Sequence, residues 1–243
     1  MLTVFIPAYN EETRIGPTLD TVLRAAAQSG CEDIEILVVN DGSSDRTGEI
    51  IDGYMKVDSR VRPLHNETNQ GIGSSFIRSL GLSTKSRFLI VPGDNDTPFD
   101  MLVKIMQHCG KAEVTLGFWL NREERGRFRN VVSQIFNTAY MLSFNIFVQY
   151  LNGPTVYPTE KLKALKLRSK KFSICAESTI KLLRSGCTFS ELSGYMQTGI
   201  EGSGSIRFSN LVEVALTFLG VLYDIHVKDR HFFNFRPRRV RLD

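Results

Sequence analysis

The chain has 243 residues, of which 42% are hydrophobic, 23% charged and 10% aromatic. These values are typical of a globular protein and exclude a disordered, collagen-like or low-complexity chain. Its 30 Lys and Arg residues against 26 Asp and Glu residues give a net charge of +4, which suits an anionic ligand or membrane surface and does not by itself require nucleic acid.

The first half of the chain alternates the signals of strands and helices. Short apolar runs predict strands at 3–7, 34–39, 61–65, 87–91 and 112–118. Between them, helices are expected to begin at Pro17, near Asp45, at Gly71 and near Pro98, and Gly30 is expected to end the first of them. Strands that alternate with helices in this way indicate βαβ units and a mostly parallel sheet.

The second half of the chain is less regular. An uncharged segment at 131–151 predicts a helix that either packs on the sheet or lies at a membrane interface. A further helix is expected at 174–184, ended by Gly186, and a strand at 188–195. The tail from Arg230 is rich in Arg and Phe, which fits a packed tail, a disordered tail or contact with anionic headgroups. We find no linker or repeat, so a single domain over 1–243 is expected.

Cysteine spacing and the N-terminus bear on the compartment of the protein. None of the four cysteines forms a Cys-x-x-Cys pair, so free thiols are expected rather than a zinc or redox site. The N-terminus shows no secretion signal, and no apolar run is both long and uncharged enough to cross a membrane. A cytoplasmic location is therefore expected.

Polar clusters follow three of the predicted strands directly, at 8–12, 40–45 and 94–96. In open parallel sheets, ligands bind at the carboxyl ends of the strands, so these clusters are the first sign of a site. Asp94 and Asp96 can approach one hard cation, Mg²⁺ or Mn²⁺, that shares its ligand shell with substrate phosphates. Taken singly, the clusters also fit acidic or helix-capping turns. If the cluster at 40–45 is a binding site instead, Asp41 would accept hydrogen bonds from the N–H group of a nucleotide base or from a ribose hydroxyl.

Four motifs in a fixed order resemble the family 2 glycosyltransferases, which have the GT-A fold. They read Pro-Ala-Tyr-Asn-Glu at 7–11, Val-Asn-Asp-Gly-Ser-Ser-Asp-Arg-Thr at 39–47, Asn-Gln-Gly-Ile-Gly at 69–73 and Asp-Asn-Asp at 94–96. Within that family the chain is similar to the dolichyl- or polyprenyl-phosphate mannosyl- and glucosyltransferases. The resemblance implies an α/β fold with a mostly parallel sheet flanked by helices. It also implies a nucleotide-sugar-binding half at 1–120 and an acceptor half with a basic tail at 121–243.

The resemblance also implies roles for individual residues. The donor-binding positions are Pro7, Tyr9, Glu11, Val39, Asp41, Asp94 and Asn95. Asp94 and Asp96 would be the metal ligands, and Asp96 would also be a catalytic carboxylate. Pro98 stands where the lipid-phosphate branch often has a metal-binding Gln. The metal is therefore expected to have fewer protein ligands, or to be optional.

The implied reaction is a single displacement with inversion, from a nucleotide-diphospho-sugar such as GDP-mannose or UDP-glucose. A divalent ion and arginines would stabilise the departing nucleoside diphosphate. The expected phosphate-binding arginines are Arg125, Arg129 and Arg207. Arg125 and Arg129 would replace the arginine of the family's Gly-Ser-Arg, which reads Gly-Phe-Trp at 117–119. Arg207 lies in a Gly/Ser loop at 199–208 that resembles the Arg-x-x-Gly-x-Ser-Lys loop of the lipid-phosphate branch but lacks its leading arginine. Asp41 can pair with uracil or guanine, which leaves both donors open.

Members of this family differ in the acceptor group that receives the sugar, which is either a lipid phosphate or a hydroxyl. A lipid phosphate is already anionic near pH 7 and needs no protein base, whereas a hydroxyl must lose its proton to a carboxylate. The chain lacks the Gln-x-x-Arg-Trp motif of hydroxyl-directed members, so a polyprenyl phosphate at the cytoplasmic membrane face is the preferred acceptor. The first alternative is transfer to a hydroxyl with Glu177 as base, although Glu177 also fits an exposed glutamate near a helix N-terminus. The second is a non-catalytic nucleotide-sugar-binding protein.

Overall fold

The computed structural model describes residues 1–121, 127–196 and 208–242, without the side chains of 127–130 and 208–211. Its sheet has eight strands in these ranges: β1 (Leu2–Ala8), β2 (Ile34–Asp41), β3 (Val61–Asn66), β4 (Arg87–Ile90), β5 (Val114–Trp119), β6 (Thr155–Pro158), β7 (Thr188–Gly194) and β8 (Arg238–Arg239). The helices are α1 (Ile15–Ser29), α2 (Thr47–Val57), α3 (Ile72–Leu82), α4 (Phe99–Gln107), α5 (Arg127–Phe144), α6 (Thr159–Lys163), α7 (Ile174–Arg184) and α8 (Phe208–Tyr223). A π-helical turn, η2 (Asp224–Lys228), continues α8.

The strand order is β3-β2-β1-β4-β6-β5-β7-β8, and β6 alone runs antiparallel to its neighbours β4 and β5. The chain builds outward from β1 to β3, then returns to place β4 on the other side of β1. The order reverses at β1 and β4, and a crevice at such a reversal is the usual ligand site of an open α/β sheet. The predicted α/β fold with a mostly parallel sheet is therefore confirmed.

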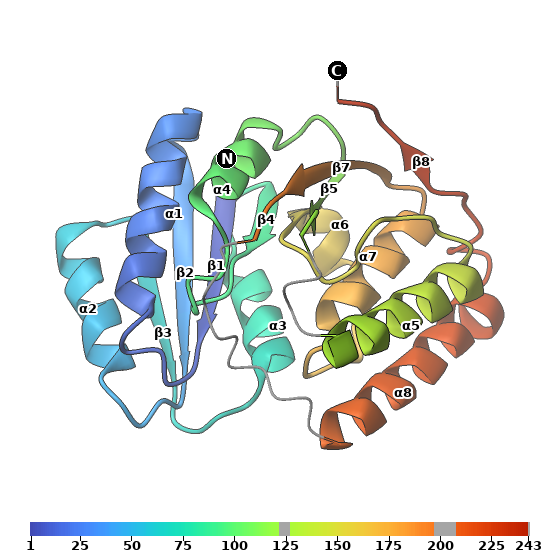
Figure 1. The fold of residues 1–243 in the computed structure, drawn as a ribbon, viewed down its shortest axis with the longest axis horizontal. Coiled ribbons are helices and arrows are strands. Elements are labelled where there is room, and N and C mark those ends of the chain that lie inside the picture. Colours follow the sequence, from blue (N-terminus) through green and yellow to red (C-terminus); the bar gives the residue numbers. More distant parts are fainter. Residues whose placement is uncertain (122–126, 197–207, 243) are drawn as a thin grey trace.

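Two apolar cores cover the two faces of the sheet. On one face, Leu19 of α1 and Leu102 of α4 pack against Val4 and Ile6 of β1. On the other face, side chains of α3, α5 and α7 pack around the alternate residue Phe5. Successive residues of β1 face opposite cores because side chains alternate along a strand. Figure 1 shows α1, α2 and α4 gathered at one end of the molecule and α5, α7 and α8 at the other.

The structure differs from the sequence expectation in the second half. The helix expected over 131–151 ends at Phe144, where Asn145 takes a positive φ of 49°. The segment that follows alternates exposed and buried residues as an extended chain does. The tail is packed, because Arg238 and Arg239 pair with β7 as the edge strand β8. Among the described residues, no helix combines the length and hydropathy needed to cross a membrane.

Candidate functional site

The site is built where β1 and β4 end side by side. The amide of Gly93 donates to the carbonyl of Pro7 at 3.1 Å, and a Cβ on Gly93 would lie 2.8 Å from that oxygen. The carbonyl of Gly93 also accepts a hydrogen bond from Thr18 Oγ1 at 3.0 Å. The absence of a side chain at Gly93 thus lets the loop that carries Asp94 and Asp96 pass directly over the end of β1.

Asp94 and Asp96 share one tight turn. The amide of Asp96 donates to Asp94 Oδ1 at 3.2 Å, and Asn95 between them has a left-handed backbone with φ 57°. The Asn95 side-chain oxygen accepts a hydrogen bond of 3.4 Å from Thr21 Oγ1 on α1. Asn95 therefore ties the turn to α1, and both aspartates are half-buried at the carboxyl end of β4.

The charge at this turn suits a divalent cation. Burial raises the pKa of Glu11, Arg14 opposes the rise, and the negative charges of Asp94 and Asp45 add to it. Carboxylates that repel one another are stabilised by a shared cation, and Mg²⁺ and Mn²⁺ take oxygen ligands. No cluster of three or more His, Cys, Asp or Glu side chains in the described ranges could hold a metal. An ion at Asp94 and Asp96 would thus take its remaining ligands from water and from substrate phosphates.

The loop after β1 is held by the loop after β2. The amide of Asn10 donates to Ser43 Oγ at 3.0 Å, and the amide of Glu11 donates to Thr47 Oγ1 at 2.8 Å. In return, the amide of Ser44 donates to the Asn10 side-chain oxygen at 2.9 Å. The side chain of Tyr9 is left half exposed at this edge, where a planar base could lie against it.

Asp41, at the end of β2, is only 4% exposed. Its carboxylate accepts hydrogen bonds from Asn66 Nδ2 at 2.7 Å, from the amide of Gln70 at 3.0 Å and from the amide of Gly71 at 2.8 Å. Among the residues that the structure describes, these three donors occupy three of the roughly four acceptor sites of a carboxylate. Asp41 therefore holds the 66–71 loop in place. The Val39 side chain is fully buried in the core, so only its backbone could contact a nucleotide.

Glu177 lies in a different environment from the one its sequence suggested. It is 0% exposed on α7, so the expectation of an exposed helical glutamate was wrong. Its carboxylate accepts the amides of Arg168 at 2.9 Å and Ser169 at 2.8 Å, and Lys181 Nζ donates to it at 2.7 Å. A general base needs a free lone pair and access to its substrate. Glu177 has the surroundings of a structural ion pair.

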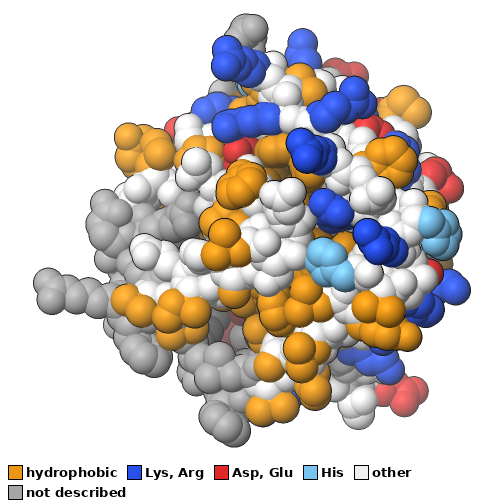
Figure 2. Space-filling view, turned by 90° about the vertical axis from the view of Figure 1, so that its right-hand side faces the viewer, with side chains coloured by type: hydrophobic (Ala, Val, Ile, Leu, Met, Phe, Trp, Pro, Cys, Tyr) orange, Lys and Arg blue, Asp and Glu red, His pale blue; other side chains and the backbone are white. Residues whose placement is uncertain are grey.

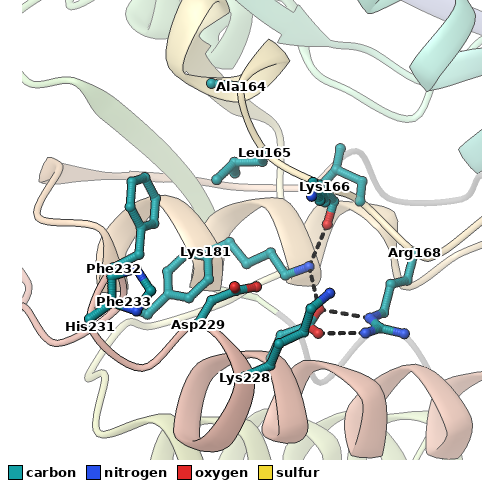
Figure 3. Close-up of a pocket in the computed structure, with 12 residues that line it drawn as sticks. Ala164, Leu165, Lys166, Arg168, Lys181, Lys228, Asp229, His231, Phe232 and Phe233 are labelled. Carbon is teal, nitrogen blue, oxygen red and sulfur yellow. Dashed lines mark hydrogen bonds and ion pairs between the residues drawn. The ribbon is translucent and has the colours of Figure 1, made fainter.

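Lys181 connects Glu177 to the end of α8. Its ammonium group also donates to Asp224 Oδ2 at 3.0 Å, and Arg168 Nε donates to the same oxygen at 2.7 Å. Lys181 Nζ donates to the carbonyl of Lys166 at 2.6 Å as well, a contact that Figure 3 shows. Burial would raise the pKa of Asp224, but hydrogen bonds from Arg168 and Lys181 outweigh it and lower that pKa to about 2. The network borders a cavity of about 440 Å³ and holds α7, η2 and the 166–169 segment together.

The expected phosphate-binding arginines fall where the structure gives no side chain. Arg125 and Arg207 lie outside the described residues, and Arg129 lies in α5 without a described side chain. The structure adds two cations that the sequence did not single out, Lys170 and Lys171. The carbonyl of Lys170 accepts the amide of Gly73 at 3.1 Å, next to the loop that Asp41 holds. The last glycine of the Asn-Gln-Gly-Ile-Gly motif permits this contact, because a Cβ on Gly73 would lie 2.3 Å from the backbone of Lys170. This glycine was the sequence feature that could have indicated the close approach of another segment.

Comparison with known proteins agrees with this geometry. The profile of "Glycosyl transferase family 2" matches residues 3–166. A dolichyl-phosphate beta-glucosyltransferase of Dictyostelium discoideum is 29% identical over 168 residues, which cover 62% of this chain and 49% of that protein. A glycosyltransferase of Streptococcus pneumoniae is 33% identical over 128 residues, covering 51% of this chain and 40% of that protein. The chain thus spans about half or less of the length of these relatives.

Solved structures extend the likeness of fold to nearly the whole chain. Glucosyl-3-phosphoglycerate synthase of Mycobacterium tuberculosis, in complex with Mn²⁺ and UDP-glucose, matches with a TM-score of 0.66 at 18% identity. The match covers 92% of this chain and 78% of that one. With the family profile over residues 3–166, the reversed strand order at β1 and β4 and the acidic turn at 94–96, the chain belongs to glycosyl transferase family 2 and has the GT-A fold.

Proposed function

We propose that this glycosyltransferase moves a glucosyl residue, with inversion, from UDP-glucose to the phosphate of a polyprenyl phosphate. Asp94 and Asp96 would hold Mg²⁺ or Mn²⁺ against the donor pyrophosphate. The names of two groups of similar proteins support the choice of sugar: dolichyl-phosphate beta-glucosyltransferases by sequence, and a UDP-glucose-bound synthase by fold.

The donor part of the proposal is supported by polar groups that lie at the carboxyl ends of three neighbouring strands. The half-exposed Tyr9 follows β1, Asp41 ends β2, and the Asp94–Asp96 turn follows β4. A bound divalent ion would supply charge for the departing diphosphate. Asp94 and Asp96 would hold it, and Glu11 would add negative potential that favours its binding.

The acceptor part of the proposal is carried by the burial of Glu177. The glutamate that could have served as a base has its carboxylate occupied by two backbone amides and by Lys181. A phosphate acceptor removes the need for a base, because its oxygen is already anionic near pH 7. That oxygen would form the new bond to the anomeric carbon as the bond from this carbon to the UDP oxygen breaks. The electron pair would leave with UDP, and no proton needs to move.

Calorimetry of donor binding tests the first half of the proposal. UDP-glucose and GDP-mannose would be titrated with and without Mn²⁺ into the wild type, Asp94→Ala/Asp96→Ala, and Asp100→Ala. Asp100 is an exposed aspartate on the first turn of α4 and serves as the matched control. We expect metal-dependent binding of UDP-glucose in the wild type and the control and its loss in the double variant. Equal, metal-independent binding in all three would refute the metal site, and a preference for GDP-mannose would refute the sugar.

Turnover tests the second half. Glucose transfer to a polyprenyl phosphate in detergent is expected for the wild type and for a folded Glu177→Gln variant. Loss of turnover in Glu177→Gln with donor binding retained would favour hydroxyl transfer through that carboxylate. Donor binding without turnover on phosphate or hydroxyl acceptors would instead favour a non-catalytic nucleotide-sugar-binding protein.

A further inference from the structure

Two neighbouring helices expose apolar stripes on one end of the molecule. On α5 the stripe consists of Val131, Ile135 and Leu142, and on α8 it consists of Leu216, Leu219 and Tyr223; we call these six residues the apolar face. Leu142 and Leu216 are 70% and 65% exposed. The helices pack through Phe218 of α8, whose ring lies 4.8 Å from that of Tyr140 on α5. Figure 2, which faces this end, shows hydrophobic side chains gathered over its lower part.

The apolar face carries no negative charge among the residues that the structure describes. The segment from 131 to 149 contains no charged residue at all. The acids of α8 and η2 point inward: Glu213 accepts hydrogen bonds from Ser169 Oγ at 2.7 Å and Ser173 Oγ at 3.1 Å, and Asp224 is 4% exposed. An exposed surface of this kind is costly in water unless something covers it.

Cations lie at the edge of the apolar face. Lys170 and Lys171 line a groove together with Leu216 in the middle of α8, and both lysines are exposed. Phe172 next to them is 60% exposed. Beyond the other end of α8, the exposed Lys228 is the last residue of η2. Figure 2 shows further Lys and Arg side chains above and beside the hydrophobic area.

We propose that the apolar face docks on a lipid bilayer that contains anionic lipids, with Lys170 and Lys171 at the level of the headgroups. An uncharged apolar centre with a cationic edge complements such a surface, because apolar side chains enter the acyl boundary and lysines meet anionic headgroups. A second copy of this chain is a poorer occupant. A two-fold contact through the same patch would bring its cationic edges close to one another.

Docking through this face would place the membrane near the 66–71 loop that Asp41 holds. Contacts lead from one to the other: Asp41 binds the amide of Gly71, the carbonyl of Lys170 binds the amide of Gly73, and Ser169 binds Glu213 of α8. A lipid phosphate in that membrane would lie near Lys170 and Lys171. This reason for docking rests on the proposed lipid-phosphate acceptor, whereas the surface itself can be tested without it.

Vesicle flotation tests the proposal. Phosphatidylcholine vesicles with and without phosphatidylserine would be mixed with the wild type, Leu216→Asp/Leu219→Asp and Met55→Asp/Val57→Asp. Met55 and Val57 are exposed hydrophobic residues on α2, at the opposite end of the molecule in Figure 1, and serve as the matched control. We expect the wild type and the control to bind the anionic vesicles. Each leucine change should weaken binding about tenfold.

A charge variant tests the cationic edge independently. Lys170→Gln/Lys171→Gln should weaken binding to anionic vesicles about fivefold for each lysine, compared with Lys56→Gln on α2 as control. Equal vesicle binding by the wild type and the leucine variant would overturn the proposal. The proposal would also be overturned if the wild type did not bind vesicles but formed a dimer in sedimentation, and the leucine variant did not form that dimer. Transfer to polyprenyl phosphate in detergent needs no bilayer, so its absence would refute the proposed function and leave the docking surface standing.

Discussion

Lys181 provides the sharpest test of the interior of the second half of the chain. Its side chain is 2% exposed, and its ammonium group is the cation shared by Glu177 and Asp224, at 2.7 and 3.0 Å. Lys181→Met keeps a long side chain but leaves Glu177, 0% exposed, without its cation, while Asp224 keeps Arg168. Removing one partner of a buried ion pair costs about 3–5 kcal/mol. For a chain of this size that corresponds to a fall in the unfolding midpoint of roughly 6–20 °C.

The loss should depend on pH in a defined direction. The pKa of Asp224 is lowered to about 2 in the folded protein, below its ordinary value. The stability that Asp224 contributes is therefore fully present above its ordinary pKa, about 4, and is lost as the pH falls through about 2. In Lys181→Met the pKa of Asp224 should move back toward its ordinary value. The difference in stability between wild type and variant should consequently shrink between pH 4 and pH 2.

Urea unfolding followed by circular dichroism measures this free energy directly. Lys166→Met is the matched control, because Lys166 contributes only its backbone carbonyl to the network and its side chain is exposed. The control should stay within about 0.5 kcal/mol of the wild type. Glu177→Gln combined with Lys181→Met should recover part of the loss, because it removes the unpaired charge. A loss below about 1 kcal/mol in Lys181→Met would refute the structural role assigned to Glu177.

Three further variants or reagents probe other parts of the molecule. Gly73→Ala should cost about 1–3 kcal/mol in calorimetric unfolding, since its Cβ would lie 2.3 Å from a backbone carbon. Gly81→Ala, with no atom within 4 Å of its Cβ, should be neutral or stabilising, and equal effects would contradict the packing. Asp41→Asn turns an amide toward backbone N–H donors and should weaken UDP-glucose binding about tenfold or more in calorimetry; unchanged affinity would contradict its role. Burial raises the pKa of Cys109 to about 11 and that of Cys175 to about 12. Alkylation at pH 8, followed by mass spectrometry, should therefore be roughly a hundredfold slower at Cys109 and roughly a thousandfold slower at Cys175 than in the unfolded chain, and equal rates would contradict the burial.

The fold of the first half of the chain could be predicted because its sequence signals are local. Each strand of the first half is a short apolar run, and Gly30 ends α1 in the left-handed conformation expected of it, with φ 71°. The polar clusters follow the strands directly, so a parallel sheet brings them to one edge without any knowledge of distant contacts. The spacing of Asp94 and Asp96 is likewise local.

The structure of the second half of the chain was harder to predict because it depends on contacts between residues that are distant in sequence. β6 is only four residues long, and it is placed by pairing with β4 and β5. Glu177 fitted an exposed glutamate because it lies near the N-terminus of a helix, whereas Asp224, 47 residues later, completes the network that buries it. The early end of α5 depends on the single left-handed residue Asn145. The roles proposed for Arg125, Arg129 and Arg207, and the division into donor and acceptor halves, stay predictions.

The chemical nature of the acceptor is tested most directly by comparing two lipids that differ in one group. Labelled UDP-glucose and Mn²⁺ would be incubated with the wild-type protein and either a polyprenyl phosphate or the corresponding polyprenol, in the same detergent. We expect labelled lipid only with the phosphate, because the buried Glu177 carboxylate already accepts hydrogen bonds from Lys181 and two backbone amides, and the proposed reaction uses no protein base. Transfer to the polyprenol at a comparable rate would contradict the base-free reaction.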